Sequence, residues 1–207
     1  MKKMAELDQD TETRIKKAAE KVFMERGYEG AKIRDIAEEA KVNIALLNYY
    51  FRSKEQLFKS IYTETFGKFF GQMVTMLNEE IPLEVKVWKI VDQYTNFLLA
   101  NPLIPMFVLT VHRTGGVDFF KDKNIKEVIQ SALLTKQLIE EAEKGNIRPI
   151  KPLHFIISVM GNVVFPFVAR PILAYIGDLD EAGFREFMEE RKKLVPEMIM
   201  AYLKQRS

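Results

Sequence analysis

One short segment of the sequence carries side chains that suit the edges of nucleic-acid bases. The amide of Asn48 can form two hydrogen bonds with an adenine edge, and the hydroxyl of Tyr49 suits a base or phosphate acceptor. Ile44, Ala45 and Leu46 can contact the methyl group of thymine. At helical spacing these side chains share one outward face, with Leu46 at its edge, so the segment could read a DNA sequence.

Groups that suit phosphate lie on either side of this segment. Lys54 falls in the first turn of a predicted helix, where a cation gains nothing from the helix dipole, so a nearby phosphate would explain its presence. Lys32 and Tyr50 offer two further phosphate contacts. From residue 41 to residue 59 the only acidic side chain is Glu55, so this stretch is basic although the net charge of the chain is only +2. A solvated helix face is the alternative interpretation of these cations.

Little in the sequence could catalyse a reaction. The absence of cysteine excludes disulfides, thiolate metal sites and thiol nucleophiles, and agrees with a reducing cytoplasmic location. His112 and His154 fall in separate predicted helices without a second ligand at helical spacing, so we expect no metal site. The sequence also lacks GxSxG, phosphate-loop and dinucleotide-binding motifs. We therefore expect no catalytic residue, no cofactor and no enzymatic activity.

Apolar spacing places the base-reading segment in a helix-turn-helix. Asn43 is expected to cap the second helix by accepting a hydrogen bond from the backbone N–H of Ala45 or Leu46. Ser53 and Gln56 form a capping box that starts a third helix. Each short helix buries one face: Ile33, Ile36, Ala37 and Ala40 in the first, and Leu47, Tyr50 and Phe51 in the second.

This pattern resembles the N-terminal DNA-binding domain of the TetR family of bacterial transcriptional regulators. The resemblance covers residues 10–60 and is carried by Ile15, Ala18, Ala19, Phe23, Gly27, Tyr28, Ile36, Ala37, Val42, Leu47, Tyr50, Phe51, Ser53, Lys54 and Glu55. It implies a homodimeric regulator, usually a repressor, that binds double-stranded DNA at a palindromic operator and senses a small-molecule effector through its C-terminal domain. The implied DNA-binding residues are Lys32, Asn43, Ile44, Ala45, Leu46, Asn48, Tyr49, Tyr50 and Lys54.

Three positions depart from the family pattern. Asn48 stands where the family usually has Tyr, and Ala45 where Gly or Pro is frequent. Both changes lie on the reading face and alter the base preference. Ala31 and Lys32 replace the Thr residues that usually start the first of the two helices, so Lys32 would supply a phosphate contact as a point charge.

The whole pattern predicts an all-α protein of about nine helices in two domains. Residues 1–60 form the DNA-binding domain, and residues 61–207 form a larger helical domain for effector binding and dimerisation. In the first domain, residues 11–26 form a helix that Gly27 ends, after a frayed tail. A helix from Ser53 to Leu77 is too long for the first domain alone and continues into the second.

Glycine and proline divide the second domain into helices. The helix after Pro82 is apolar on nearly all sides, so we expect it to be deeply buried. The longest apolar run, residues 155–176, contains Asn162 and Arg170 as well as prolines, so we expect no membrane span. The further expected helices are residues 102–114, residues 122–144, one that starts at Pro152, kinks at Pro166 and ends near Pro171, and residues 179–204.

Bulky side chains of the second domain are the candidates for an effector site. Sites between bundle helices are common, and Met and aromatic side chains adapt to irregular apolar molecules, although most such residues are ordinary core. The candidates are Phe66, Phe69, Phe70, Met73, Trp88, Tyr94, Phe97, Met106, Phe107, His112, Met160 and Asn162.

Two helices of the second domain carry more apolar surface than one neighbour can cover. These are the last helix and the helix that begins at Pro152, and we expect them to form an isologous four-helix dimer interface. The candidate interface residues are Ile156, Val163, Phe167, Phe184, Phe187, Leu194, Met198 and Tyr202.

Two alternative functions remain open. In the first, the protein binds DNA but its C-terminal domain only dimerises or binds a protein partner, so its core would be filled. In the second, an all-helical enzyme carries a DNA-binding-like end, which would require acid, base or metal groups to converge inside the larger domain.

Overall fold

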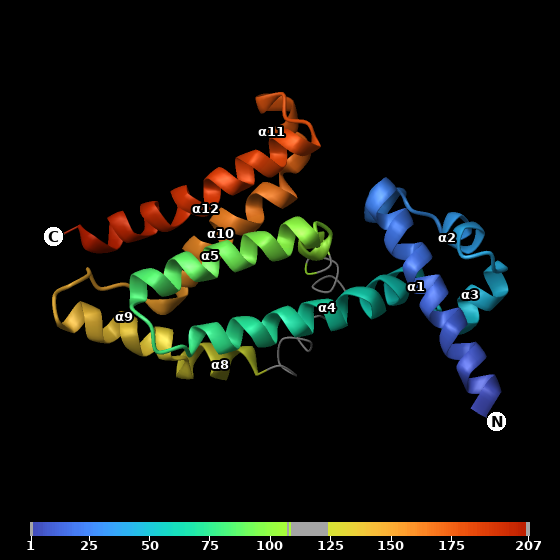
Figure 1. Ribbon diagram of the computed structural model, residues 1–207, viewed down its shortest axis with the longest axis horizontal. Helices are drawn as coiled ribbons and strands as arrows, with labels where there is room; N and C mark the ends of the chain where they lie inside the picture. The colour runs from blue at the N-terminus through green and yellow to red at the C-terminus, as the bar shows by residue number, and fades with distance from the viewer. Residues whose placement is uncertain (1, 107, 109–123, 206–207) are drawn as a thin grey trace. The chain divides into compact units, whose positions relative to one another are not determined.

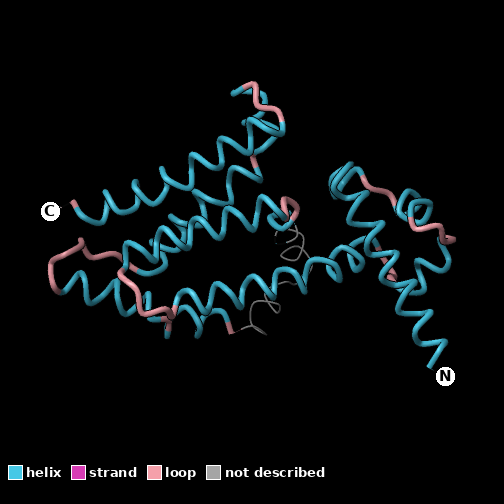
Figure 2. Tube along the Cα trace, viewed as in Figure 1, coloured by secondary structure: helices cyan, strands magenta, loops and turns pink. Residues whose placement is uncertain are grey.

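The computed structural model describes residues 2–106, 108 and 124–205, and these residues form helices and loops with no β-strand among them (Figure 1 and Figure 2). The predicted all-α fold is confirmed. The described helices are α1 (Lys2–Gly30), α2 (Ile33–Glu39), α3 (Ile44–Tyr50), α4 (Lys54–Leu77), α5 (Leu83–Ala100), α8 (Ile125–Ser131), α9 (Leu133–Glu143), α10 (Pro152–Val168), α11 (Arg170–Gly177) and α12 (Glu181–Lys204).

The described chain divides into two compact units. One boundary falls inside α4, between Lys68 and Phe69, and a second lies between Pro105 and Met106, which returns to the first unit. The first unit contains α1, α2, α3 and the N-terminal part of α4. The second contains the rest of α4, α5 and α8 to α12. One helix therefore contributes residues to both units. α4 begins directly after Ser53, as predicted. The backbone N–H of Gln56 donates to Ser53 Oγ at 3.1 Å, so Ser53 caps the helix.

Aromatic and small apolar side chains form the core of the first unit. The rings of Phe23 in α1 and Phe58 in α4 meet edge to face at 4.9 Å between centroids, and both side chains are fully buried. Ile36 of α2 and Leu47 of α3 are also fully buried. Edge-to-face rings and full burial stabilise this small core, which holds the two short helices in place.

The turn between α2 and α3 closes with a Schellman motif. The N–H of Val42 donates to the carbonyl of Ala37 at 3.0 Å, and the N–H of Lys41 donates to that of Glu38 at 3.1 Å. Lys41 adopts a left-handed conformation with φ of 54°, which glycine adopts at lower cost. The turn therefore keeps helix-turn-helix geometry with a non-glycine residue at its most strained position.

In the second unit, α5, α10 and α12 pack side by side (Figure 1). Val91 of α5, Val163 of α10 and Val195 of α12 are each at most 1% exposed. The prediction that α5 is buried on nearly all sides was wrong in detail. Val85 is 50% exposed, whereas the charged Lys86 is fully buried. Apolar residues can remain at a helix surface, so composition alone did not identify the buried face.

The predicted single helix over residues 122–144 is two helices, α8 and α9. Ala132 between them is extended, with φ of −58° and ψ of 143°, and is neither glycine nor proline. The signal for the break lies elsewhere in the chain. Asn78 Oδ1, just after α4, accepts a hydrogen bond from the N–H of Leu133 at 3.1 Å and so caps α9.

Helix ends differ from prediction at three further places. α1 begins at Lys2 rather than residue 11, although Gly27, with a non-helical φ of 69° and ψ of 172°, interrupts the helix where its end was predicted. Pro171 does not end a helix but lies in the first turn of α11, where its missing N–H costs nothing. α12 begins after Asp180, whose carboxylate accepts from the N–H of Gly183 at 2.8 Å. The predicted helix 102–114 lies largely outside the described residues.

Among the described helices, none is long and apolar enough by itself to cross a membrane. The pair α10 and α11 reaches that length and composition only together, with a 73° bend between them.

Candidate nucleic-acid interface

The recognition segment lies on α3, which buries one residue and presents the others. Asn43 Oδ1 accepts a hydrogen bond of 2.7 Å from the N–H of Leu46, so the predicted N-cap is confirmed. Leu47 is fully buried and anchors the helix to the core of the first unit. Phe51, just after α3, is also buried. The helix is thus fixed at both ends and in the middle.

The opposite side of α3 is open to solvent. Tyr49 is 76% exposed and Ile44 is 44% exposed, and Ala45, Leu46 and Asn48 are exposed as well. This is the outward face predicted from the sequence. A short helix with one buried anchor and a solvent-facing side of this composition is the element that helix-turn-helix proteins place in the major groove.

Tyr50 differs from its exposed neighbour. It is half-buried, and its ring meets that of Tyr49 edge to face at 5.3 Å and that of Phe51 at 6.4 Å. These aromatic contacts restrict the Tyr50 ring. A restricted hydroxyl at the edge of the helix suits a phosphate contact better than a base contact, in line with the predicted role.

Lys54 has a structural role that sequence reasoning missed. Its ammonium group donates to the carbonyls of Tyr28 at 2.8 Å and Ala31 at 3.1 Å, and lies 4.5 Å from the centre of the Tyr28 ring. These carbonyls are at the C-terminal end of α1, where a helix dipole favours a cation. A phosphate is therefore not needed to explain this lysine. Two of its three N–H groups are used, which leaves one for a phosphate.

Lys32 precedes α2 and is exposed. Its backbone N–H donates to Asp35 at 3.3 Å, and the same carboxylate pairs with Arg26 at 2.6 Å. Asp35 thus caps α2 from its first turn, in place of the hydroxyl that the sequence lacks before the helix. The acidic residue three positions after Lys32 was the signal available for this cap.

Three of the predicted effector residues meet in one aromatic cluster. The rings of Phe69 in α4 and Phe97 in α5 stack with 3.8 Å between their centroids and 6° between their planes. The centroid of the Tyr94 ring lies 5.0 Å from that of Phe69. Burial raises the pKa of Tyr94 to about 12. A neutral tyrosine hydroxyl in an apolar cluster could orient a ligand or simply complete the core.

The other effector candidates are distributed more widely. Met106 and Met160 are 39% and 41% exposed, so these two side chains face solvent in the single chain. The half-buried Asn162 is held by α12, because its oxygen atoms accept from Arg191. Phe66, Phe70, Met73 and Trp88 are half-buried. Phe107 and His112 lie outside the described residues.

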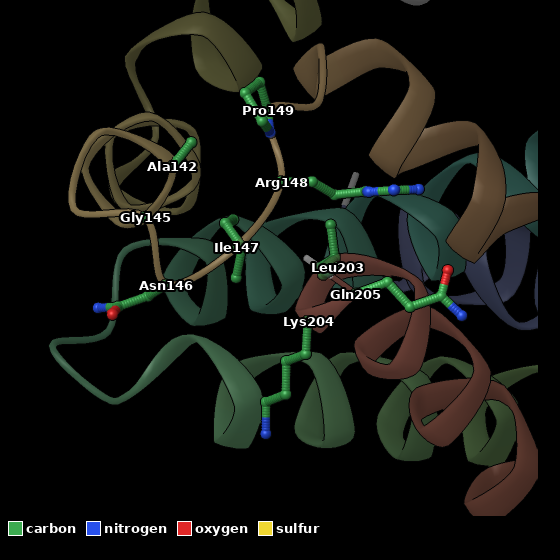
Figure 3. A pocket seen from close by; sticks show the side chains of 9 residues that line it. All are labelled: Ala142, Gly145, Asn146, Ile147, Arg148, Pro149, Leu203, Lys204 and Gln205. Atoms are coloured by element: carbon green, nitrogen blue, oxygen red, sulfur yellow. The ribbon is translucent and has the colours of Figure 1, made fainter. Parts of the chain in front are cut away.

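Three pockets formed by described residues lie in other parts of the second unit. One is between the loop after α9 and the C-terminal end of α12, where Ile147 and Leu203 line its wall (Figure 3). Its volume is 210 Å³, below the roughly 300 Å³ at which small-molecule sites begin. The second is lined by Lys151 and His154, and the third by Asn162 and Met198. Within the described residues, no group of acidic and histidine side chains could hold a metal ion.

The dimer candidates separate into buried and exposed residues. Val163, Phe167 and Phe184 are at most 8% exposed, so they belong to the core of their own chain. They are not available to a second copy, which corrects the prediction that they form the interface. Ile156 and Phe187 are half-buried. The candidates that remain open are Leu194, Met198 and Tyr202, at 46%, 51% and 48% exposure.

The structure adds exposed apolar residues that sequence reasoning missed. α10 and α11 are apolar on more than one side, so their periodicity did not reveal which side packs against α12. The additional exposed side chains are Leu153, Ile157, Phe165, Val168, Ile172, Tyr175 and Ile176. Together with the exposed part of α12 they are large apolar side chains left in water by the single chain, and exposed groups of this kind often mark an interaction surface when they are contiguous.

Comparisons with known proteins agree with this architecture. Residues 15–61 match the family model described as bacterial regulatory proteins, tetR family. The chain is 24% identical to the probable HTH-type transcriptional regulator YttP of Bacillus subtilis, over 88% of this chain and 90% of that protein. It is 27% identical to the HTH-type transcriptional repressor NicS of Pseudomonas putida, over 67% of this chain and 66% of that protein.

Solved structures show the same fold. A TetR transcription regulator from Haloarcula marismortui aligns with a TM-score of 0.62 at 18% identity, over 94% of this chain and 99% of that one. The regulator FadR from Bacillus subtilis, solved in complex with stearoyl-CoA, aligns with a TM-score of 0.59 at 16% identity, over 88% of this chain and 96% of that one.

Proposed function

We propose that this chain, which belongs to the TetR family of bacterial transcriptional regulators, acts as a homodimeric repressor that binds a palindromic operator and releases it when a small apolar effector binds. DNA binding and transcriptional regulation follow from the family. The operator symmetry, the dimer and the effector are proposals, and each rests on a separate part of the structure.

The solvent-facing side of α3 is the observation that carries the proposal. Leu47 is its only buried residue, while Tyr49 is 76% exposed and Asn48 projects from the same face. Asn48 and Tyr49 are polar groups able to bond base edges, and Ile44 and Ala45 can contact thymine methyls. We assign sequence preference to these four residues and phosphate binding to Lys32, Tyr50 and the remaining N–H of Lys54.

The exposed apolar side chains of α10 and α12 support the proposed dimer. Leu194 and Met198 are about half exposed, and such side chains favour association with an identical copy. Two copies of α3 would then enter successive major grooves, roughly 34 to 36 Å apart. This arrangement requires a palindromic or nearly palindromic DNA site.

The effector is assigned to the region where α4 and α5 meet. Phe69 of α4 stacks directly on Phe97 of α5, and α4 also carries Lys54 in the first unit. A ligand that separates these rings would move α4 and change the spacing of the two recognition helices. A coupling of about 1 to 3 kcal/mol lowers operator affinity roughly 5- to 150-fold. By reciprocity, operator DNA must weaken effector binding by the same factor.

Operator selection followed by variant binding tests the DNA-binding part. The unmutated protein should enrich a palindromic sequence from random duplexes. Asn48→Ala should change the ranking of operator variants, because it removes a base contact. Lys32→Ala should weaken all duplexes alike and reduce the slope of log K against log salt by about one. Equal binding of every duplex by the unmutated protein would refute specific recognition.

A ligand screen tests the effector part. Stearoyl-CoA, the ligand in the FadR structure, is the first compound to test, followed by apolar molecules found by thermal shift. A true effector should bind less tightly when operator DNA saturates the protein. Equal affinity with and without operator would show that the site is not coupled to DNA binding for that compound.

A further inference from the structure

Arg191 of α12 carries a positive charge that no described residue of its own chain neutralises. Its Nη2 atom donates to the backbone carbonyl and side-chain oxygen of Asn162, at 2.9 and 3.2 Å. Its guanidinium lies 5.6 Å from the centre of the Phe187 ring. Its Nε atom is buried and has no hydrogen-bond partner among the described residues. On the same helix, the carboxylates of Glu181 and Glu189 pair with other cations.

A partly buried arginine without a carboxylate is unfavourable. Burial lowers the pKa of Arg191, yet a guanidinium remains charged at physiological pH. The bonds to Asn162 fix its position but bring no negative charge. A buried Nε–H without an acceptor adds the cost of a lost hydrogen bond. An approaching carboxylate would neutralise the charge, because it can accept from guanidinium N–H groups that Asn162 does not use.

The surroundings of Arg191 indicate where the carboxylate comes from. Leu194 and Met198 follow at three and seven residues, so they share its side of α12, and both are about half exposed. A free anion would neutralise Arg191 but leave these apolar side chains in water. A protein surface that supplies a carboxylate beside apolar residues would neutralise Arg191 and also cover Leu194 and Met198.

α12 itself carries such a surface. Glu190 precedes Arg191 and Glu197 precedes Met198, so each carboxylate is turned about 100° from the apolar stripe and flanks it. Both are exposed, and neither forms an ion pair within the described part of the chain. This side of α12 therefore presents a cation and apolar groups, with acidic groups along its edge. Such a surface is complementary to itself, as a two-fold interface requires.

We propose that a second copy of the chain supplies a carboxylate, from Glu190 or Glu197, to Arg191, and that the two symmetric ion pairs set the register of the dimer. This inference rests on the proposed homodimer and assigns its specificity. Desolvated charge pairs at interfaces fix which surfaces pair, while apolar neighbours supply most of the burial.

A charge-exchange experiment tests the pairing. Arg191→Glu places like charges opposite each other in a homodimer, as does Glu→Arg at the one position, 190 or 197, that pairs with Arg191. Arg191→Glu and that one Glu→Arg variant should each associate at least roughly 30-fold more weakly than the unmutated protein, measured by sedimentation over a concentration series. A mixture of Arg191→Glu with the correct Glu→Arg variant should form a heterodimer, because both symmetric contacts then join opposite charges. Lys193→Glu, with the same charge change on an exposed residue of α12, should leave the association unchanged.

The mixing step separates a broken interface from a misfolded chain. An unfolded Arg191→Glu chain could not be rescued by a partner, and circular dichroism of each variant reports its helix content directly. Arg191→Gln, which keeps a donor for Asn162, should fold and still dimerise more weakly. A dimer unaffected by Arg191→Glu, or no rescue by either Glu→Arg variant, overturns the ion pair while leaving the homodimer intact. A monomeric unmutated protein overturns both proposals.

Discussion

The guanidinium of Arg191 donates a 2.9 Å hydrogen bond to the backbone carbonyl of Asn162, four residues before Pro166. In a regular helix this carbonyl would accept from the N–H of residue 166, but proline has none. Arg191 therefore replaces the missing helical hydrogen bond from a neighbouring helix. This explains why α10 passes through Pro166 and continues to Val168.

A double-mutant cycle tests this relationship. Arg191→Met should lower the free energy of unfolding by about 1 to 3 kcal/mol, because it leaves the Asn162 carbonyl unpaired. In a Pro166→Ala background the same change should cost less, since the introduced alanine has a backbone N–H that takes over the bond. Urea unfolding at one fixed protein concentration measures all four variants. Additive effects would show that the two residues are independent.

Lys41→Gly should stabilise the first unit. Lys41 has φ of 54°, a left-handed conformation in which a side chain costs roughly 1 to 2 kcal/mol. Part of the gain is offset because glycine is more flexible in the unfolded chain, so the expected net increase is about 0.5 to 1 kcal/mol. Lys41→Ala keeps the steric cost and serves as the control. In thermal unfolding the Lys41→Gly variant should have a higher midpoint than the Lys41→Ala variant and the unmutated protein. Equal midpoints for the glycine and alanine variants would contradict backbone strain at this position.

Lys54→Met should destabilise the protein even when no DNA is present. The change removes the charge-assisted bonds to the carbonyls of Tyr28 and Ala31, and such bonds each contribute roughly 1.5 to 3 kcal/mol net of exchange with water. Arg34→Met is the control, because Arg34 pairs with Glu38 one turn away on α2, an exposed contact worth only a few tenths of a kcal/mol. Chemical denaturation without DNA distinguishes them. If both variants lost equal stability, the bridging role of Lys54 would be wrong.

Lys86 should make stability depend on pH in the alkaline range. Its ammonium group is fully buried and donates to Gln137 at 2.7 Å and to the carbonyl of Leu77 at 3.2 Å. Burial lowers its pKa, partly offset by Glu79. The unfolded chain therefore binds this proton more tightly, and stability rises with pH between the folded pKa and the unfolded value of about 10.4.

Lys86→Met isolates that contribution. The variant lacks the titrating group, so subtracting its unfolding free energy cancels the effects of other residues. The free energy of unfolding of the unmutated protein minus that of the variant should be larger at about pH 9.5 than at about pH 7.5. Guanidinium unfolding at the two pH values gives both terms. A difference that stayed constant or fell with pH would contradict the buried charge.

Local contacts were predictable from the sequence, whereas distant ones were not. Asn43 caps α3 through Leu46, three residues away, so residue types and spacing were sufficient. Lys54 binds carbonyls that are 26 and 23 residues away, and no local pattern specifies that contact. The break at Ala132 likewise depends on Asn78, 55 residues before the N–H that it caps.

Apolar periodicity separated buried from exposed residues only where a helix has one apolar side. α3 has one such side, and Leu47 was placed correctly at its centre. α10 is apolar on several sides, so spacing alone did not separate Val163, which is 1% exposed, from Ile157, which is 58% exposed. The choice between core and dimer surface requires knowledge of which helix packs against which, and that comes from the tertiary structure.

The exposed apolar stripe of α12 makes the proposed regulator sensitive to gene dosage. Leu194 and Met198 are half exposed in the single chain, so under the proposed homodimer operator-competent protein would form only above the dimer dissociation constant. Below that concentration the amount of dimer varies with the square of the chain concentration, and halving the number of gene copies lowers it about fourfold. A cell that partitions few molecules at division would therefore pass through intervals in which its operators are unoccupied without any effector.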